Sequence, residues 1–241
     1  MRSHTLFRRL ILSVSERVGL VRPESRIEVL RRTISVYAVI FVLWGLYRLL
    51  FRFPTIIEEL IFKPLVFLPP VLSVLVGEGK RGRALFEAFG FRRERLSLSI
   101  YFGLTLGVVY LLAVRLAGYV PSGERIGILP FTSVSWLSLL GVSLMTAVWE
   151  QMVFSGFFLS RFYHSFGNEW ESVGLTAFLY TLLHFPILWF ESHASASFIV
   201  IQLILFFFVG MGNAILMLRT RNLVAPILSH TFWSVAVGLF S

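Results

Sequence analysis

The sequence predicts an all-α membrane protein: a polytopic bundle of about seven transmembrane helices, preceded by an N-terminal amphipathic interfacial helix. Three observations support this fold class. Hydrophobic residues make up 56% of the chain, and the mean hydropathy of +0.80 is far above that of soluble domains. Apolar runs of about twenty residues, long enough to cross a bilayer as helices, recur along the sequence. Basic residues concentrate in alternate loops between these runs.

The N-terminal segment, residues 1–32, is expected to be a basic region at the cytoplasmic membrane interface. Within residues 5–20 the apolar side chains share one helical face, whereas the charged side chains lie largely elsewhere. This pattern predicts a helix lying on the cytoplasmic leaflet. A helix packed on the cytoplasmic face of the protein itself would show the same pattern, and both interpretations stay open.

Residues 33–241 are predicted to form one membrane domain, whose motif-bearing core is 134–240. The second of its seven spans contains three prolines, so we expect that helix to be kinked. The spans are expected at about 33–51, 59–77, 96–114, 134–160, 172–190, 198–217 and 222–240.

The distribution of charge predicts the orientation and the partners. Lysine and arginine gather in the N-terminal segment, in the loop at 78–95, and just after the fourth and sixth spans. The positive-inside rule places this side, with the N-terminus, in the cytoplasm. The net charge of +9 therefore indicates anionic lipid headgroups, and no nucleic-acid partner is expected. Because the sequence carries no organellar signal, we expect an integral protein of a prokaryotic cell membrane.

The fourth span carries Glu150 and Gln151 near its middle. A carboxylate at that depth is costly, so an intramembrane ionisable residue indicates function when polar partners exist elsewhere in the membrane. His184 in the fifth span and His230 in the seventh supply such partners. With a rise of about 1.5 Å per residue, the three groups lie about 12–18 Å from the cytoplasmic ends of their helices. We therefore expect them to converge on one water-containing cavity.

Such a cavity favours hydrolysis. A buried glutamate with few charged neighbours can act as a base, and a histidine opposite it can hold the same water and shuttle the proton. A second histidine can donate to the oxyanion that develops when a carbonyl is attacked. Ser234 follows His230 by one helical turn on the same face, so it can donate as well, and Tyr180 shares the face of His184 in the same way.

Three motifs carry a resemblance to a known family. They read EQMVFSG from Glu150, YTLLH from Tyr180 and HTFWS from His230. The sequence resembles the CPBP family of intramembrane proteases, the CAAX prenyl endopeptidase, Rce1-type and ABI proteins. The motifs of that family are Glu-Glu-x-x-x-Arg, Phe-x-x-x-His and His-x-x-x-Asn. The resemblance covers about residues 134–240, and spans one to three match only in general character.

The resemblance implies that Glu150 activates water, that His184 assists it, and that His230 forms the oxyanion site with residue 234. Four positions depart from the family pattern. Gln151 replaces the second glutamate, Ser155 the arginine, Tyr180 the phenylalanine and Ser234 the asparagine. The first two changes remove one carboxylate and one cation, so they compensate each other. Gln151 and Tyr180 are expected to support the site rather than to react.

Zinc is the cofactor that these residues could hold. Glu150, His184 and His230 can supply three ligands and leave a fourth position open, and the family is often labelled a metalloprotease family. The sequence has no HExxH helix, and each ligand comes singly from a different span. A carboxylate and two donors suffice for the chemistry, so we prefer metal-free activation of water and expect no cofactor.

The preferred function is that of an intramembrane endopeptidase, a hydrolase that cuts a membrane peptide or a lipidated protein. A catalytically impaired family scaffold with a binding or immunity role is the alternative, because the motifs depart at residues 151, 155 and 234. A small proton-coupled transporter, using Glu150 and His184 as a relay, is less favoured because the sequence shows no inverted repeats.

Each polar residue also has a structural interpretation. Glu150 would be a buried carboxylate bonded to a neighbouring span, and each histidine would pack and donate to a backbone carbonyl. The functional interpretation is preferred because all three groups occur together, in the register of the motifs. Glu59 and Lys63 are spaced for an ion pair near the outer interface, with Lys63 snorkelling, and no chemistry is assigned to them.

Overall fold

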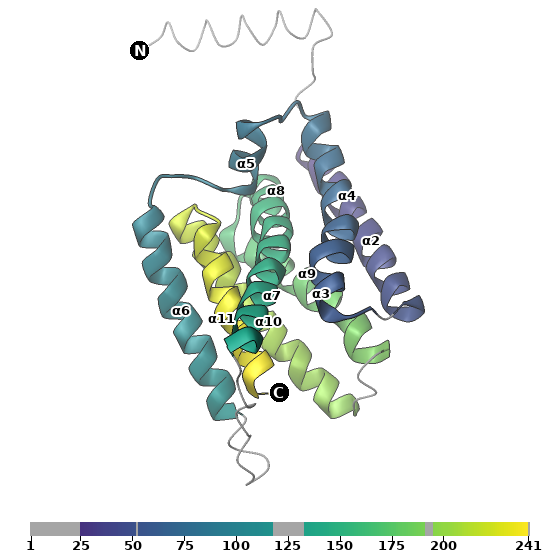
Figure 1. Ribbon diagram of the computed structural model, residues 1–241. Helices are drawn as coiled ribbons and strands as arrows, with labels where there is room; N and C mark the ends of the chain where they lie inside the picture. Colours follow the sequence, from purple (N-terminus) through teal and green to yellow (C-terminus); the bar gives the residue numbers. More distant parts are fainter. Residues whose placement is uncertain (1–24, 52, 118–132, 191–194, 241) are drawn as a thin grey trace, which may run out of the picture.

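The computed structural model describes residues 25–51, 53–117, 133–190 and 195–240. The predicted amphipathic helix at 5–20 lies outside these ranges. Within them the structure is helical (Figure 1). The elements are α2 (Arg26–Leu50), α3 (Thr55–Ile57), η1 (Glu58–Phe62), α4 (Lys63–Gly77), α5 (Arg83–Phe89), α6 (Leu96–Ala117), α7 (Ser133–Gln151), η2 (Met152–Phe158), α8 (Leu159–Phe166), α9 (Glu169–Phe190), α10 (Ala196–Thr220) and α11 (Val224–Phe240).

Among the described residues, six helical runs are long and apolar enough to cross a membrane, and Val224–Leu239 forms a shorter apolar helix. Two of the runs join several elements: α3, η1 and α4 make one, and α7, η2 and α8 make another. Each run coincides with a span expected from the hydropathy. The predicted fold class, a polytopic transmembrane bundle of about seven helices, is confirmed.

The first span begins earlier than its hydropathy suggests, at Arg26 instead of about residue 33. Ser25 caps the helix, because its hydroxyl accepts a hydrogen bond from the backbone N–H of Glu28 and the Glu28 carboxylate accepts one from the backbone N–H of Ser25. This capping box satisfies two N–H groups that the first turn would leave unpaired. The helix therefore starts in the polar interface, before the apolar run.

The second span contains the irregularity that its prolines predict. Glu58–Phe62 forms a π-helical turn, and α4 then continues through Pro69 and Pro70. Pro64 has no backbone N–H and cannot bond to the carbonyl four residues earlier, which is where the π turn lies. A second π turn, η2, follows Gln151 directly. Single π turns inside α-helices are frequent at functional sites.

The helices pack around α7 and its continuation into α8 (Figure 1). The element α6 packs mainly on α11, which also contacts α7, whereas α10 packs on α9 and α2 contacts α4, α8 and α9. Two glycines allow the close approaches. A Cβ on Gly103 would lie 2.7 Å from the carbonyl oxygen of Ala225, and one on Gly210 would lie 2.8 Å from the ring of Tyr180. Close packing through small residues is the usual way for membrane helices to associate.

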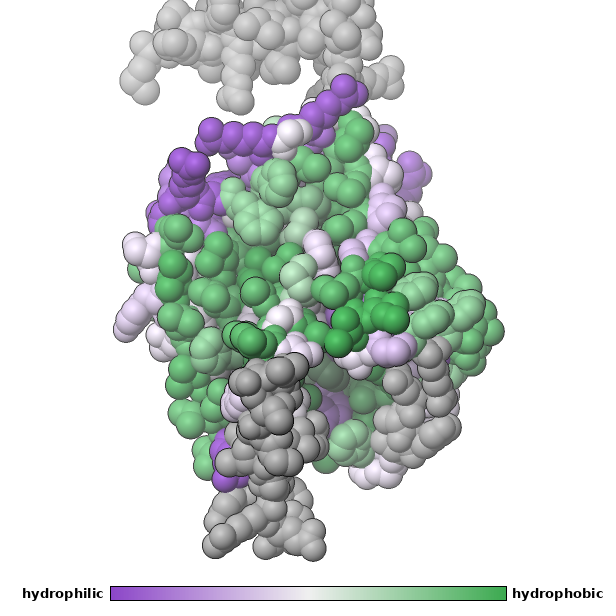
Figure 2. Space-filling model, in the orientation of Figure 1, coloured by the Kyte–Doolittle hydropathy of each residue, from purple (hydrophilic) through white to green (hydrophobic). Residues whose placement is uncertain are grey.

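The surface separates into a polar end and an apolar belt (Figure 2). Hydrophilic residues gather at the end of the molecule where α5 lies, and apolar residues cover the helices beyond it. The polar end includes the exposed basic residues of the loop at 78–95. Large apolar side chains such as Val108 and Leu112 of α6 are exposed, as expected where a helix faces lipid. The protein is an integral membrane protein.

Candidate active site

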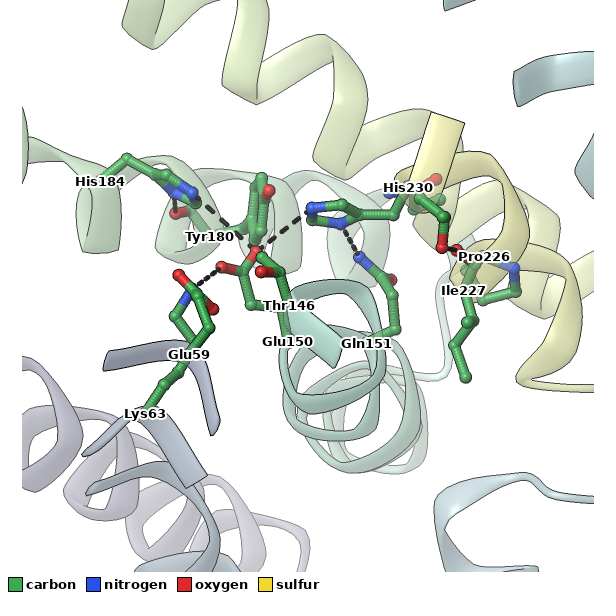
Figure 3. A network of polar contacts seen from close by, with 12 residues as sticks. Glu59, Lys63, Thr146, Glu150, Gln151, Tyr180, His184, Pro226, Ile227 and His230 are labelled. Atoms are coloured by element: carbon green, nitrogen blue, oxygen red, sulfur yellow. Dashed lines mark hydrogen bonds and ion pairs between the residues drawn. The ribbon is translucent and has the colours of Figure 1, made fainter. Parts of the chain in front are cut away.

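Glu150 is the centre of the buried polar network (Figure 3). It lies in the last turn of α7, and only 3% of its surface is exposed. Its Oε1 atom accepts a hydrogen bond of 2.9 Å from Nζ of Lys63. Its Oε2 atom has no hydrogen-bond partner among the described residues. One carboxylate oxygen is therefore held by a cation, and the other is left for a ligand.

Lys63 is the residue that the sequence interpretation placed wrongly. It does not snorkel to the outer interface, because it is buried in the bundle, 4% exposed, and its ammonium also donates to Oε1 of Glu59 at 2.7 Å. The expectation that Glu150 has few charged neighbours is wrong for the same reason. A charged side chain inside a membrane span is energetically costly whether it is a glutamate or a lysine, so the reasoning that identified Glu150 would also have identified Lys63.

The two histidines face the free carboxylate oxygen (Figure 3). Nε2 of His230 lies 3.5 Å from Glu150 Oε2, and Nε2 of His184 lies 3.9 Å from the same atom. These separations exceed a direct hydrogen bond, and they suit groups that share a bound water. The structure therefore brings together the three groups that the sequence places at one depth in three different spans.

The second nitrogen of each histidine is anchored. Nδ1 of His184 lies 2.9 Å from the backbone carbonyl of Tyr180. Nδ1 of His230 lies 2.7 Å from Nε2 of Gln151, and Oε1 of that amide accepts a hydrogen bond of 2.5 Å from the hydroxyl of Ser155. Gln151 and Ser155, which depart from the family motif, thus form a continuous chain of contacts with His230. These anchors fix both imidazole rings toward Glu150.

Aromatic rings enclose the histidines. The Tyr180 ring lies between them, with centroid separations of 4.6 Å to His184 and 5.9 Å to His230. Phe206 of α10 stacks on His184 at 4.0 Å. The Tyr180 hydroxyl is buried and has no hydrogen-bond partner among the described residues. Tyr180 therefore forms a wall of the site.

Ser234 is less closely integrated. It lies one turn beyond His230 in α11 and is partly exposed. No hydrogen bond joins it to the other candidate residues in the described part of the chain. The structure thus assembles Glu150, Gln151, Tyr180, His184 and His230, whereas Ser234 stays one helical turn away.

A second buried ion pair lies beside the site. Arg48 of α2 is paired with Glu58 of η1, and the Tyr47 hydroxyl donates to Oε2 of Glu58 at 3.2 Å. The Arg48 guanidinium lies 4.6 Å from the Trp44 ring, and Nζ of Lys63 lies 5.7 Å from the same ring. Trp44 thus contacts both cations, and cation–π attraction favours this arrangement. Sequence reasoning missed this cluster because both charges stand near the ends of predicted spans.

The donor set does not fit a catalytic zinc ion. No group of three or more His, Cys, Asp or Glu side chains among the described residues could hold a metal ion. The ammonium of Lys63 is bonded directly to Glu150 and supplies there the positive charge that a divalent ion would bring. A zinc ion bound by Glu150 and the two histidines would lie beside that ammonium, with which it shares a sign of charge.

Comparison with known proteins supports the resemblance seen in the motifs. Residues 132–236 match a family model described as Type II CAAX prenyl endopeptidase Rce1-like. No curated protein and no solved structure matches the chain. The match contains Glu150, Gln151, Ser155, His184 and His230. Over these residues, the predicted resemblance to the CPBP and CAAX protease family is confirmed. Lys63, Glu59 and Arg48 lie outside the matched segment.

Proposed function

Because residues 132–236 carry the Rce1-like pattern of the CAAX protease family, we propose that this protein is an intramembrane endopeptidase that hydrolyses a peptide bond with water activated by Glu150. The observation that carries the proposal is the position of Glu150 Oε2, which faces Nε2 of His230 at 3.5 Å and Nε2 of His184 at 3.9 Å. A buried carboxylate between two imidazoles is an arrangement suited to general base catalysis.

In the proposed reaction, a water molecule lies between Glu150 Oε2 and His184. Glu150 takes a proton from the water as the water oxygen bonds to the carbonyl carbon of the peptide. The carbonyl oxygen becomes an oxyanion, and His230 donates a hydrogen bond to it, with Ser234 as a second candidate donor. When the C–N bond breaks, the proton held by Glu150 passes to the leaving nitrogen through His184.

Lys63 is proposed to orient the base. Its ammonium holds Glu150 Oε1 at 2.9 Å, and Glu59 holds the ammonium in turn. This arrangement turns Oε2 toward the histidines and balances the buried charge without blocking Oε2. Lys63 touches the catalytic carboxylate and comes from the second span, so the proposed machinery extends beyond the matched segment.

The proposed substrate is a membrane peptide or a lipidated protein, because the site lies within membrane-spanning helices. Residues 33–241 are proposed to act as one membrane domain, and the proposed location is a prokaryotic cell membrane. The polar end with α5 is proposed to face the cytoplasm, because its loop at 78–95 is rich in basic residues. Cysteine labelling tests this orientation in a chain without cysteine. The variant Lys80→Cys should be labelled from the cytoplasmic side, and labelling only from outside would reverse the orientation.

The experiment that tests the function is cleavage of a library of membrane peptides by the purified protein in lipid vesicles. Product termini are identified by mass spectrometry, with His184→Asn and His230→Asn as variants and His164→Asn as the matched control. We expect cleavage by the wild type and by the control, and its near loss in both site variants. Equal cleavage by all four proteins would overturn the assignment of the site.

A catalytically impaired scaffold is the second candidate function. It is favoured by the departures at Gln151, Ser155 and Ser234. This alternative predicts that the wild type cleaves no membrane peptide and that the cellular phenotype is indifferent to Glu150→Gln. The contact of Gln151 with His230 and the hydrogen bond from Ser155 to Gln151 weigh against it, because both departures from the family motif form part of the site.

A further inference from the structure

We propose that Gln151 and Ser155 are a positioning pair that fixes His230 as a hydrogen-bond donor, while the Tyr180 carbonyl fixes His184 as an acceptor. The two imidazoles would then face Glu150 Oε2 with opposite tautomers. Both Nε2 atoms point to the same oxygen, whereas the two Nδ1 atoms contact groups of opposite hydrogen-bonding character.

The tautomer of His184 follows from its backbone contact. A carbonyl oxygen only accepts hydrogen bonds, so the Nδ1 atom 2.9 Å from the Tyr180 carbonyl must carry the hydrogen. In a neutral imidazole the other nitrogen is then unprotonated. His184 therefore presents a lone pair at Nε2 toward Glu150 Oε2, and it can accept a hydrogen bond or a proton from a water bound there.

The tautomer of His230 follows from the amide of Gln151. The amide nitrogen only donates, so the Nδ1 atom 2.7 Å from it must accept, and the hydrogen of the neutral ring is then on Nε2. Ser155 bonds the other end of the amide: its hydroxyl donates to Gln151 Oε1 at 2.5 Å, and the amide nitrogen faces the ring. Both residues are buried, at 1% and 2% exposure, so water does not compete for these contacts.

The π turn accounts for the position of this pair. Ser155 lies inside η2, which begins directly after Gln151. A serine within a regular helix commonly donates to the carbonyl four residues earlier. Here the hydroxyl donates to the side chain of that residue instead. η2 is held in place at Gly156, where a Cβ would lie 2.6 Å from the carbonyl oxygen of Phe89 in α5.

The opposite tautomers give the two histidines different roles at the site. His184 offers an acceptor to the attacking water, and His230 offers an N–H to the oxyanion. The family glutamate at position 151 would be an acceptor when ionised, and it would require a hydrogen on Nδ1 of His230. The roles in hydrolysis rest on the proposed function, whereas the tautomers are a property of the resting protein and are tested without any substrate.

The test is nitrogen NMR of the full-length protein labelled with ¹⁵N-histidine and reconstituted in lipid. Signals are assigned with His184→Asn and His230→Asn. We expect the hydrogen on Nδ1 in His184 and on Nε2 in His230. In Gln151→Glu we expect a hydrogen on Nδ1 of His230, and Ser160→Ala, a matched change on the same helical run, should leave the wild-type pattern intact.

Two results would overturn the inference: identical tautomers in both wild-type histidines, or a His230 signal in Gln151→Glu identical to that of the wild type. If Gln151→Glu does not fold, the wild-type spectrum still decides the first result, and Ser155→Ala replaces the variant, with a mixture of His230 tautomers expected. Turnover is measured separately, and loss of the Nε2 hydrogen of His230 should lower it by about 10²-fold. A tautomer shift in a protein with no turnover would refute the proposed peptidase function and leave the tautomers established.

Discussion

The two halves of the described chain hold their buried charges differently. In residues 25–117 the cations and anions are in direct contact: Arg48 is paired with Glu58, and Nζ of Lys63 lies 2.6 Å from Glu59. In residues 133–240 the buried ionisable groups stand apart, because Glu150 Oε2 is 3.5 and 3.9 Å from the two histidine nitrogens. Lys63 is the group of the first half that contacts the centre of the second.

This difference in spacing distinguishes charged groups that support the structure from groups proposed to take part in the reaction. A buried ion pair in direct contact satisfies its own charges and has little left to offer a ligand. Polar groups that lie beyond direct hydrogen-bond distance, each anchored through its other end, are arranged to share a bound ligand. The matched segment supplies the groups proposed to react, and the second span supplies the charges, Lys63 and Glu59, that hold one of them in place.

The largest expected effect comes from breaking the contact between the halves. Lys63→Met leaves two buried carboxylates, Glu59 and Glu150, without their shared ammonium. Loss of one partner from a buried ion pair typically costs about 3–5 kcal/mol of stability. We expect that loss in denaturant unfolding, and also a fall in turnover per folded molecule, because Glu150 loses the contact that orients it.

Arg48→Met is the matched control, since it breaks the other buried pair without touching Glu150. It should destabilise the protein by a similar amount and leave turnover per folded molecule little changed. Equal losses of turnover in both variants would show that Lys63 acts through stability alone, and the distinction between the two pairs would fail.

The next effect sharpens the role of the motif departures. Gln151→Glu places a carboxylate without a cationic partner in the core, so it should destabilise the fold. Ser155→Arg should supply the missing cation. A double-mutant cycle on the free energy of unfolding should give a favourable coupling of about 0.5–3 kcal/mol. Coupling indistinguishable from zero would mean that residues 151 and 155 are not one unit.

A smaller effect is expected at the edge of the site. Ser234→Asn should hold turnover or raise it a few-fold, because the longer amide reaches further toward the oxyanion proposed to form beside His230. The measurement is kcat for one cleaved peptide. Ser229→Asn is unsuitable as a control, because Ser229 is buried and its hydroxyl donates to Asn213. A fall in kcat with an intact fold would remove residue 234 from the oxyanion site.

The smallest effect is expected from removing metal. Activity should survive exhaustive chelation, and the purified protein should hold far less than one equivalent of zinc, because Lys63 already balances the charge of Glu150. Metal content and turnover are measured on the same sample. Loss of activity that added zinc restores would contradict metal-free activation of water.

Much of the fold was accessible from the sequence, because hydropathy and length determine where helices cross a membrane. The runs at α6, α9 and α10 lie close to their predicted ranges. The start of α2 was missed because a capping box, Ser25 with Glu28, decides it, and hydropathy does not register hydrogen bonds. The π turn after Gln151 also had no signal, since no proline marks it as Pro64 marks η1, and packing determines its geometry.

The site was accessible where a single residue carries an energetic cost. Glu150, His184 and His230 are each expensive in a membrane, and their shared depth predicted that they meet. Lys63 was overlooked because Glu59, one turn earlier, appeared to be a sufficient partner. The side-chain directions that bring Lys63 to Glu150 depend on how α4 packs against α7, which no local pattern in the sequence records.

The most direct test of the central claim compares two buried carboxylates in one assay. Glu150→Gln and Glu58→Gln each replace a carboxylate that is bonded to a cation with an isosteric amide, and only the first carboxylate faces the histidines. Turnover of a membrane peptide by folded protein in lipid vesicles is measured for both variants and the wild type. Glu150→Gln should lower kcat by about 10²–10⁴-fold, the usual contribution of a general base, while Glu58→Gln keeps most of the activity. Wild-type turnover in Glu150→Gln would contradict the assignment of Glu150 as the base.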